Sequence, residues 1–384
     1  MITRQITSKI ETLTSKFPII TLTGPRQSGK STLLRKCFPT YRYVSLENID
    51  IRNFAASDPN GFIKTYPDHV IIDEAQLVPE LFSYLQTHVD TTEREGMYFL
   101  SGSNNFMMMQ RIGQSLAGRT VLLTLLPFSH REMKEGGILP ATTGEEIFKG
   151  GYPRLYDKDI SPTDYYPSYI QTYVERDIRL LKNISNLDKF TRFVKLCAGR
   201  IGQLLNLASL ANECGIAVST ANEWLSLLET SYICYVLRPD HNNFAKRLVK
   251  TPKLYFYDTG LACSLLQITS AEQLSTHFLR GGLFENLVIN EFIKSSYNRG
   301  EIPDLCFWRD SAGTEIDLIS YTNGIPHAYE IKSASTFSPG FFKNLTKWAK
   351  LAGVEPDRCS VIYDGDTSMA TTQGEIIGWR TLDI

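Results

Sequence analysis

The sequence lacks the patterns that would place it in a membrane or in an oxidising compartment. None of its apolar runs is long enough to span a bilayer, and the polar segment at positions 1–16 has no apolar signal core. The seven cysteines are scattered without a C-x-x-C pair, which argues against both a disulfide framework and a zinc site. We therefore expect a cytoplasmic protein with reduced cysteines.

An excess of either charge is also missing. Forty basic residues stand against 41 acidic ones, a net charge of −1, which argues against a protein that coats nucleic acid along its whole surface but leaves room for local basic patches. The 384 residues, 42% of them hydrophobic and 21% charged, suffice for two or three globular domains with their own cores.

One stretch near the N-terminus carries a clear chemical signature. It matches G-x-x-x-x-G-K-[ST], follows an apolar run (17–22) that predicts a strand, and leads into a predicted helix (32–37). Glycines let such a loop wrap a phosphate chain, Lys30 would reach the β- and γ-phosphates, and Ser31 would ligate Mg²⁺. The alternative is a glycine-rich turn before an ordinary helix. The predicted nucleotide-binding residues here are Gly24, Pro25, Arg26, Gln27, Ser28, Gly29, Lys30, Ser31 and Thr32.

A second motif is the apolar run 70–72 that ends in Asp73 and Glu74. A buried parallel strand is continuously apolar, and its carboxyl end can deliver carboxylates to a nucleotide site. We expect Asp73 to hold the metal together with Ser31, and Glu74 to orient and polarise the attacking water. A strand that ends in a solvated acidic turn is the alternative, which the preceding phosphate loop disfavours.

Two further predictions rest on single residues. The strand predicted at 97–104 has a polar end, so that Ser103 or Asn104 could sense the γ-phosphate or simply form a turn. Arg119 precedes the next apolar strand, 121–126, and could stabilise transition-state charge in its own chain or in a neighbouring subunit of a homo-oligomer. A surface arginine without a catalytic role is the alternative.

The middle of the chain predicts a winged helix. A helix at 206–214, a turn at Gly215 and a second helix capped by Ser219 form a helix-turn-helix, and alternating strands follow at 232–237 and 253–257. The loop between these strands would be a basic wing for DNA phosphates. The second helix has no Arg or Lys, so packing or protein contact is the alternative to DNA binding. The charged wing residues are Arg238, Asp240, Lys246, Arg247 and Lys250.

The last third contains a separate set of charged residues. Glu285 lies in the first turns of an amphipathic helix, and strands are predicted at 315–319 and 328–332. A hairpin around Thr322-Asn323-Gly324 would bring Asp317, Glu330 and Lys332 to one face. Carboxylates there could bind Mg²⁺ beside a lysine that positions water, or the charges could simply pair with one another.

This order, Glu then Asp then Glu-x-Lys, resembles the PD-(D/E)xK nuclease core of restriction enzymes and Holliday junction resolvases. The resemblance implies a metal site of Glu285, Asp317 and Glu330, with Asp317, Glu330 and Lys332 as catalytic residues. Glu315-Ile316 precedes Asp317 where that pattern has proline. Such domains can also lose cleavage and keep a binding surface, so that both outcomes stay open.

As a whole, the chain resembles prokaryotic AAA-type ATPases with a C-terminal DUF4143 region. The motifs that carry this resemblance are Gly24 to Ser31, Asp73-Glu74-Ala75-Gln76, Leu116-Ala117-Gly118-Arg119, Gly150-Gly151-Tyr152-Pro153, Tyr173-Val174-Glu175-Arg176-Asp177-Ile178, Tyr257-Asp258-Thr259-Gly260-Leu261 and Gly282-Leu283-Phe284-Glu285-Asn286.

The resemblance implies an α/β fold in three parts. These are a P-loop ATPase domain (1–151), a helical and winged-helix domain (152–265) and a nuclease-like domain (266–384). We expect an ATP- and Mg-dependent hydrolase coupled to DNA binding, with DNA cleavage by the nuclease-like domain left open. The alternative is an ATP-dependent switch that acts on a protein partner through an inactive nuclease-like domain.

Overall fold

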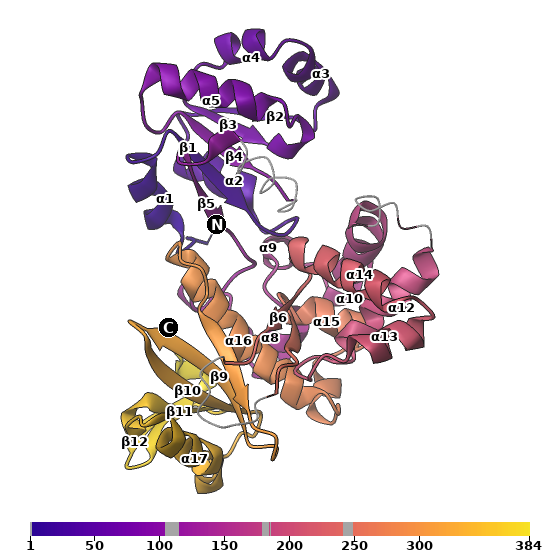
Figure 1. The fold of residues 1–384 in the computed structure, drawn as a ribbon, viewed down its shortest axis with the longest axis vertical. Coiled ribbons are helices and arrows are strands. Elements are labelled where there is room, and N and C mark those ends of the chain that lie inside the picture. Colours follow the sequence, from indigo (N-terminus) through magenta and orange to yellow (C-terminus); the bar gives the residue numbers. More distant parts are fainter. Residues whose placement is uncertain (1, 104–114, 179–183, 185, 241–248) are drawn as a thin grey trace.

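The computed structural model describes residues 2–103, 115–178, 184, 186–240 and 249–384. Figure 1 shows the N-terminal part at one end of the long axis, the C-terminal sheet at the other, and a mainly helical region beside them. In these described ranges, no helix is long and apolar enough to cross a membrane. All seven cysteines are free, as the sequence predicts.

The N-terminal part is built on a five-stranded sheet with the order β2-β3-β4-β1-β5, in which every pair is parallel. All carboxyl ends of the strands therefore meet at one edge. Strand β4 lies between β1, which precedes the phosphate loop, and β3, which ends at Asp73. The strands are β1 (Ile19–Thr23), β2 (Arg42–Ser45), β3 (Val70–Asp73), β4 (Tyr98–Ser101) and β5 (Thr120–Thr124).

Helices cover both faces of this sheet. Neighbouring residues of β1 point to opposite faces, so that Ile19 joins one apolar core and Ile20 joins the other. Helices α1 (Thr7–Thr14) and α2 (Lys30–Cys37) cover the face of Ile20. The opposite face is covered by α3 (Ile49–Ser57), α4 (Pro59–Thr65) and α5 (Leu81–Thr92).

Helix α4 follows α3 directly, because the one residue between them caps the new helix. The Asp58 side chain accepts a hydrogen bond from the Gly61 amide at 2.9 Å and caps the helix, and Pro59 occupies its first position, where proline costs no hydrogen bond.

The middle region is mainly helical, with one two-stranded antiparallel sheet, β6 (Cys234–Leu237) and β7 (Lys253–Phe256). The predicted helix pair is present. Helix α13 (Leu207–Cys214) ends at Gly215, whose φ of +60° suits a glycine, and α14 (Val218–Thr230) follows. Ala217 precedes the first residue of α14, so the prediction that Ser219 caps this helix was wrong. The other elements here are α7 (His130–Glu135), α8 (Thr143–Lys149), α9 (Pro153–Asp157), α10 (Pro162–Tyr169), a π-helix (Ile170–Ile178), α12 (Leu187–Ala198) and α15 (Thr259–Leu265).

The C-terminal part is a mixed six-stranded sheet with the order β12-β13-β11-β10-β9-β8. The predicted hairpin is confirmed: β9 and β10 pair in antiparallel fashion, and Asn323 and Gly324 between them both have positive φ, +54° and +75°, as a tight hairpin turn requires. The elements are α16 (Arg280–Asn298), β8 (Leu305–Arg309), β9 (Glu315–Thr322), β10 (Ile325–Lys332), α17 (Lys343–Ala352), β11 (Cys359–Tyr363), β12 (Met369–Thr371) and β13 (Gly374–Gly378).

The middle and C-terminal regions share one apolar core. A single cluster of buried side chains contains Phe193 of α12, Phe256 of β7 and Leu283 of α16. Asn286 of α16 adds two hydrogen bonds to the β7 backbone: its Oδ1 accepts from the Phe256 amide and its Nδ2 donates to the Phe256 carbonyl, both at 2.8 Å. The predicted boundary at 265/266 thus falls within a continuous core.

A buried aspartate joins this core to the chain that leaves the ATPase sheet. Asp258 accepts hydrogen bonds from the Gly151 amide at 2.8 Å, the Leu261 amide at 2.9 Å and the Tyr166 hydroxyl at 2.7 Å. Gly151 in turn accepts from the Phe128 amide at 2.8 Å. Two motifs of the family resemblance, at 150–153 and 257–261, therefore meet at one structural joint.

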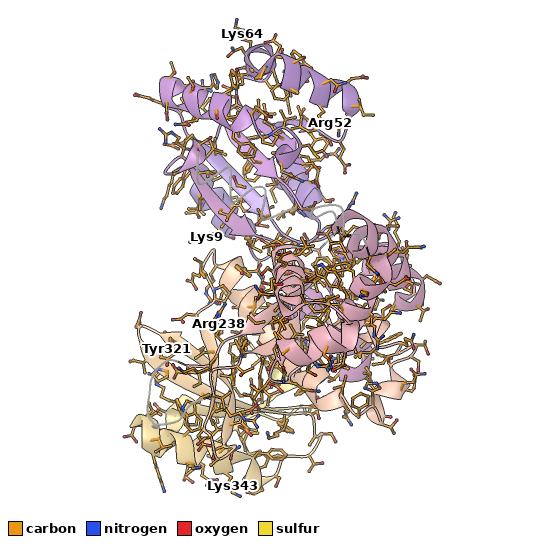
Figure 2. The ribbon with its side chains drawn as sticks, turned by 45° about the vertical axis from the view of Figure 1, so that its right-hand side comes forward. Lys9, Arg52, Lys64, Arg238, Tyr321 and Lys343 are labelled. Atoms are coloured by element: carbon orange, nitrogen blue, oxygen red, sulfur yellow. The ribbon has the colours of Figure 1, made fainter. Side chains whose placement is uncertain are left out.

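The base of the predicted wing lies against the C-terminal sheet. The Arg238 carbonyl accepts from the Phe307 amide at 3.1 Å, and the Asp240 amide donates to the Phe307 carbonyl at 2.7 Å. Figure 2 labels Arg238 and Tyr321 at this junction, where the Tyr321 hydroxyl donates to Asp240 at 3.0 Å. The predicted wing residues Lys246 and Arg247 lie outside the described residues.

Candidate ATP site and a C-terminal carboxylate cluster

The phosphate loop connects β1 to α2 with a backbone that depends on two glycines. Gly24 has a φ of +141°, and a Cβ there would lie 2.1 Å from the Leu125 carbonyl oxygen on β5's carboxyl side. Gly29, with a φ of +95°, directly precedes α2. Gly24 leaves no room for a side chain, and the φ of Gly29 disfavours one, so both glycines suit a backbone that turns tightly before the helix.

The loop residues differ in their environment. Pro25 and Ser28 are buried, whereas Arg26, Gln27 and Thr32 are exposed. The Ser28 hydroxyl has no hydrogen-bond partner among the described residues although it is buried. Lys30 is buried as well, and its ammonium donates to the carbonyls of Gly24 at 3.0 Å and Pro25 at 2.8 Å. An unpaired hydroxyl and an ammonium held only by carbonyls are groups that a phosphate chain would satisfy.

Asp73 is the centre of the predicted metal site. The Ser31 hydroxyl donates to its Oδ2 at 2.8 Å, and the Ser101 hydroxyl at the end of β4 donates to its Oδ1 at 2.6 Å. Tyr43, at the edge strand β2, donates to Oδ2 at 2.6 Å. The structure thus brings the predicted pair Ser31 and Asp73 together, and the donor set of a hydroxyl and a carboxylate suits Mg²⁺.

Glu74 follows Asp73 with a left-handed backbone, φ +53°. Its Oε2 accepts hydrogen bonds from the Gln76 side-chain Nε2 and from the Ser103 hydroxyl, the latter at 3.3 Å. Burial raises the pKa of Glu74 above its usual value, against the neighbouring Lys30 charge, which lowers it. Ser103 therefore lies beside Glu74, shortly after the end of β4, and its role as a phosphate sensor stays a prediction. Asn104, the other candidate, lies outside the described residues.

Arg119 is not brought to the phosphate loop of its own chain. It precedes β5, and its carbonyl accepts from the amide of Ile19, the first residue of β1. Arg119 therefore lies at the amino edge of the sheet, opposite the loop. Its guanidinium pairs with Asp90 at 2.6 Å and 2.8 Å. The prediction of a catalytic arginine acting within one chain is not met, and action on a neighbouring subunit stays a prediction.

Several residues that contact the loop carry no local signal in the sequence. The buried Arg4 donates to the carbonyls of Ser28 at 3.0 Å and Leu126 at 2.6 Å, and it pairs with Glu132 at 3.0 Å. Tyr232 follows α14, and its hydroxyl lies 2.9 Å from the hydroxyl of Thr23, the last residue of β1 before the loop. Of the site residues that the sequence analysis missed, Ser101 is the one that the sequence could have indicated, because alternation along β4 places it on the same side as Ser103.

The C-terminal charged residues also come together. Lys332 pairs with Glu330 at 2.6 Å and lies 3.8 Å from Asp317, whose Oδ2 accepts from the Ile331 amide at 2.8 Å. Glu285 reaches the same cluster from α16. In the described part of the chain, however, no three Asp, Glu, His or Cys side chains are placed to share a metal ion. Two of the predicted metal ligands, Glu285 and Asp317, instead face the ammonium of Lys253. The metal site of Glu285, Asp317 and Glu330 stays a prediction.

Three protein-family models match consecutive parts of the chain. A model of an AAA domain matches residues 16–134, a domain of unknown function (DUF8612) matches 142–272, and DUF4143 matches 280–382. The chain thus carries an AAA-type P-loop domain followed by DUF8612 and DUF4143 regions. The segment predicted to form a winged helix falls in the DUF8612 match.

Relatives of this AAA-domain chain are found in mycobacteria. It is 27% identical over 394 residues to the uncharacterized proteins Rv2008c of Mycobacterium tuberculosis and Mb2031c of Mycobacterium bovis, covering 99% of this chain and 86% of theirs. Among solved structures, the Walker-type ATPase PABY2304 of Pyrococcus abyssi is similar with a TM-score of 0.46 at 13% identity, over 68% of this chain and 94% of the other. A RuvB Holliday junction branch migration motor of Thermotoga maritima gives a TM-score of 0.31 at 14% identity, over 62% and 90%.

Proposed function

We propose that this AAA-domain chain binds and hydrolyses ATP with Mg²⁺ and couples the cycle to DNA binding. One observation carries the ATPase proposal. Ser31, Asp73 and Glu74 come from different elements and meet at the carboxyl edge of the parallel sheet, next to the phosphate loop. That edge is where open parallel sheets bind their ligands.

Each residue has a role that follows from its surroundings. Ser31 and Asp73 would hold Mg²⁺, which neutralises developing phosphate charge when it is bound. Lys30 would exchange its two carbonyl partners for phosphate oxygens, which form stronger charge-assisted hydrogen bonds. Glu74, oriented by Gln76 and Ser103, would position the attacking water and accept its proton.

The burial of Lys30 makes ATP binding depend on pH. Burial lowers the pKa of Lys30 to about 8, while Glu74 and Asp73 oppose this shift. Bound phosphate favours the charged ammonium, so ATP affinity should be constant below pH 8 and fall as the free protein loses this proton. Between pH 8 and pH 9 we expect up to about a tenfold rise in Kd, measured by calorimetric titration with a non-hydrolysable ATP analogue. The Lys30→Arg variant is the control, because arginine stays charged and its Kd should not follow this pH dependence. A wild-type Kd that is flat to pH 9 contradicts the prediction.

The coupling to DNA rests on the middle region. Helices α12, α13 and α14 and the β6–β7 hairpin follow one another in winged-helix order, and Arg238 and Lys250 flank the loop between the strands. Tyr232 links the end of α14 to Thr23, directly before the phosphate loop. A ligand that moves α14 would therefore act on the nucleotide site through a direct contact.

Steady-state ATP turnover tests the coupling. Purified protein is assayed with and without duplex, single-stranded and branched DNA, at low and moderate salt, with Glu74→Gln as the background control. We expect DNA to stimulate turnover and the stimulation to fade with salt, since phosphate contacts release counterions. Turnover that is indifferent to every DNA contradicts the proposal.

A second candidate, a switch that acts on a protein partner, is favoured by the surface of α14. Its exposed positions carry no Arg or Lys and include an acidic residue, which a DNA-reading helix would not favour. Turnover that responds to a protein partner and ignores DNA would support it. These exposed residues are Val218, Ser219, Asn222, Glu223 and Ser226.

A further inference from the structure

Lys253 reaches the C-terminal carboxylates from outside the C-terminal sheet. It is the first residue of β7, in the middle region, and its side chain is only 3% exposed. Its ammonium lies 2.8 Å from Glu285 Oε1, contacts Glu315 Oε1 and lies 3.9 Å from Asp317 Oδ1. Three carboxylates from α16 and β9 thus converge on one lysine nitrogen.

The surrounding groups fix these carboxylates around that nitrogen. The Tyr255 hydroxyl donates to Glu285 Oε1 at 2.5 Å, Arg309 pairs with Glu315 at 2.7 Å, and the Ile331 amide donates to Asp317 at 2.8 Å. A buried carboxylate cluster requires positive charge nearby, because removal from water penalises each ion. Lys253 supplies that charge at the centre of the cluster.

The fourth acid of the cluster, Glu330, has one carboxylate oxygen that makes no hydrogen bond to the described residues. Glu330 is buried, and its Oε1 accepts from Lys332, whereas its Oε2 has no hydrogen-bond partner in the described part of the chain. A cation at the centre of a nuclease site is normally held by several such oxygens. Here the acids are present, but the central positive group is an ammonium.

The cluster is also covered by backbone. Gly202, with a φ of +73°, lies so close to α16 that a Cβ there would be 3.1 Å from Gly282 Cα and 3.4 Å from Glu285 Oε2. A Cβ at Gly282 would lie 2.7 Å from the Ile201 carbonyl oxygen. Residues 201–202 therefore pack directly on the first turn of α16, beside the carboxylate that faces Lys253.

We propose that Lys253 permanently takes the place of a divalent cation in this cluster. The site then serves as an electrostatic clamp that fastens β7 to α16 and β9, and the C-terminal domain does not cleave DNA through a metal. DNA or a protein partner would act as an effector of this chain, not as a substrate of this cluster. The proposal is independent of ATP turnover.

Manganese binding tests it, because Mn²⁺ prefers carboxylate ligands and is visible by electron paramagnetic resonance. The 384-residue chain is titrated with Mn²⁺ in the absence of nucleotide, as wild type, Asp317→Asn, Lys253→Met and Lys253→Met/Asp317→Asn. We expect wild type to show no binding that depends on Asp317. The Lys253→Met variant should gain a site of at least tenfold higher affinity than any wild-type binding, and the second substitution should remove it.

Lys294→Met is the matched control, since Lys294 is equally buried but pairs with a single carboxylate, Glu291, at 2.8 Å. It should gain no site. Wild-type Mn²⁺ binding that Asp317→Asn abolishes overturns the proposal, as does a folded Lys253→Met chain that gains no site. If circular dichroism shows that the methionine variant does not fold, Lys253→Gln is judged by the same criterion, and the wild-type titration remains decisive by itself.

Discussion

Replacing Glu74 with glutamine is expected to lower ATP turnover by about 10²- to 10⁴-fold, the usual loss when a general base is removed. Glutamine keeps the shape of the side chain, so ATP affinity should change little. Because burial raises the pKa of Glu74, wild-type turnover should also decline on acidification at a higher pH than an ordinary glutamate would give. Steady-state phosphate release between pH 5 and pH 9 measures both effects.

Glu47→Gln is the control for this prediction. Glu47 is exposed and lies 3.8 Å from Arg26 of the phosphate loop, so the variant also removes one negative charge near the site. Its turnover should stay within about a factor of two of wild type, as for most surface changes. Normal turnover by Glu74→Gln would show that another group activates the water.

Replacing Asp258 with alanine should be the most destabilising of these changes. The variant leaves the Gly151 amide, the Leu261 amide and the Tyr166 hydroxyl buried without their acceptor. Each unsatisfied donor costs about 1–3 kcal/mol, so we expect a loss of about 3–5 kcal/mol in the free energy of unfolding after local relaxation. Urea denaturation followed by circular dichroism measures it.

Two further variants serve as a control and as an intermediate case for this measurement. Asp157 is exposed, and Asp157→Ala should change the unfolding midpoint very little. Asp258→Asn keeps one acceptor oxygen and should fall between wild type and alanine. An Asp258→Ala chain as stable as wild type would mean that the joint between residues 151 and 258 is not needed to hold the middle region together.

The sequence predicted those features whose signals are local. The phosphate loop, the strand that ends at Asp73 and the Asn323-Gly324 hairpin each need particular residues at adjacent positions, because glycine, carboxylate and turn geometry act over a few residues. The carboxylates of the C-terminal cluster followed from the hairpin, since alternation along two paired strands fixes which side chains share a face.

Other features could not be predicted because they join distant segments. Lys253 is an ordinary strand residue in the sequence, and only the fold shows that it meets Glu285 and Asp317. Arg4 and Tyr232 reach the phosphate loop in the same way. Arg119 does not reach the phosphate loop of its own chain for a simpler reason: it precedes its strand, whereas the loop and Asp73 follow theirs, and parallel strands place those positions at opposite edges.

The core shared by the middle and C-terminal regions determines where the chain can be cut into fragments that fold. The matches to DUF8612 and DUF4143 meet between residues 272 and 280, yet Phe193, Phe256 and Leu283 pack in one apolar cluster across that point. A fragment cut there would expose apolar side chains of that cluster to water and separate Asn286 from its Phe256 partners. Because the two regions share this core, expression of either one alone should yield an aggregation-prone polypeptide.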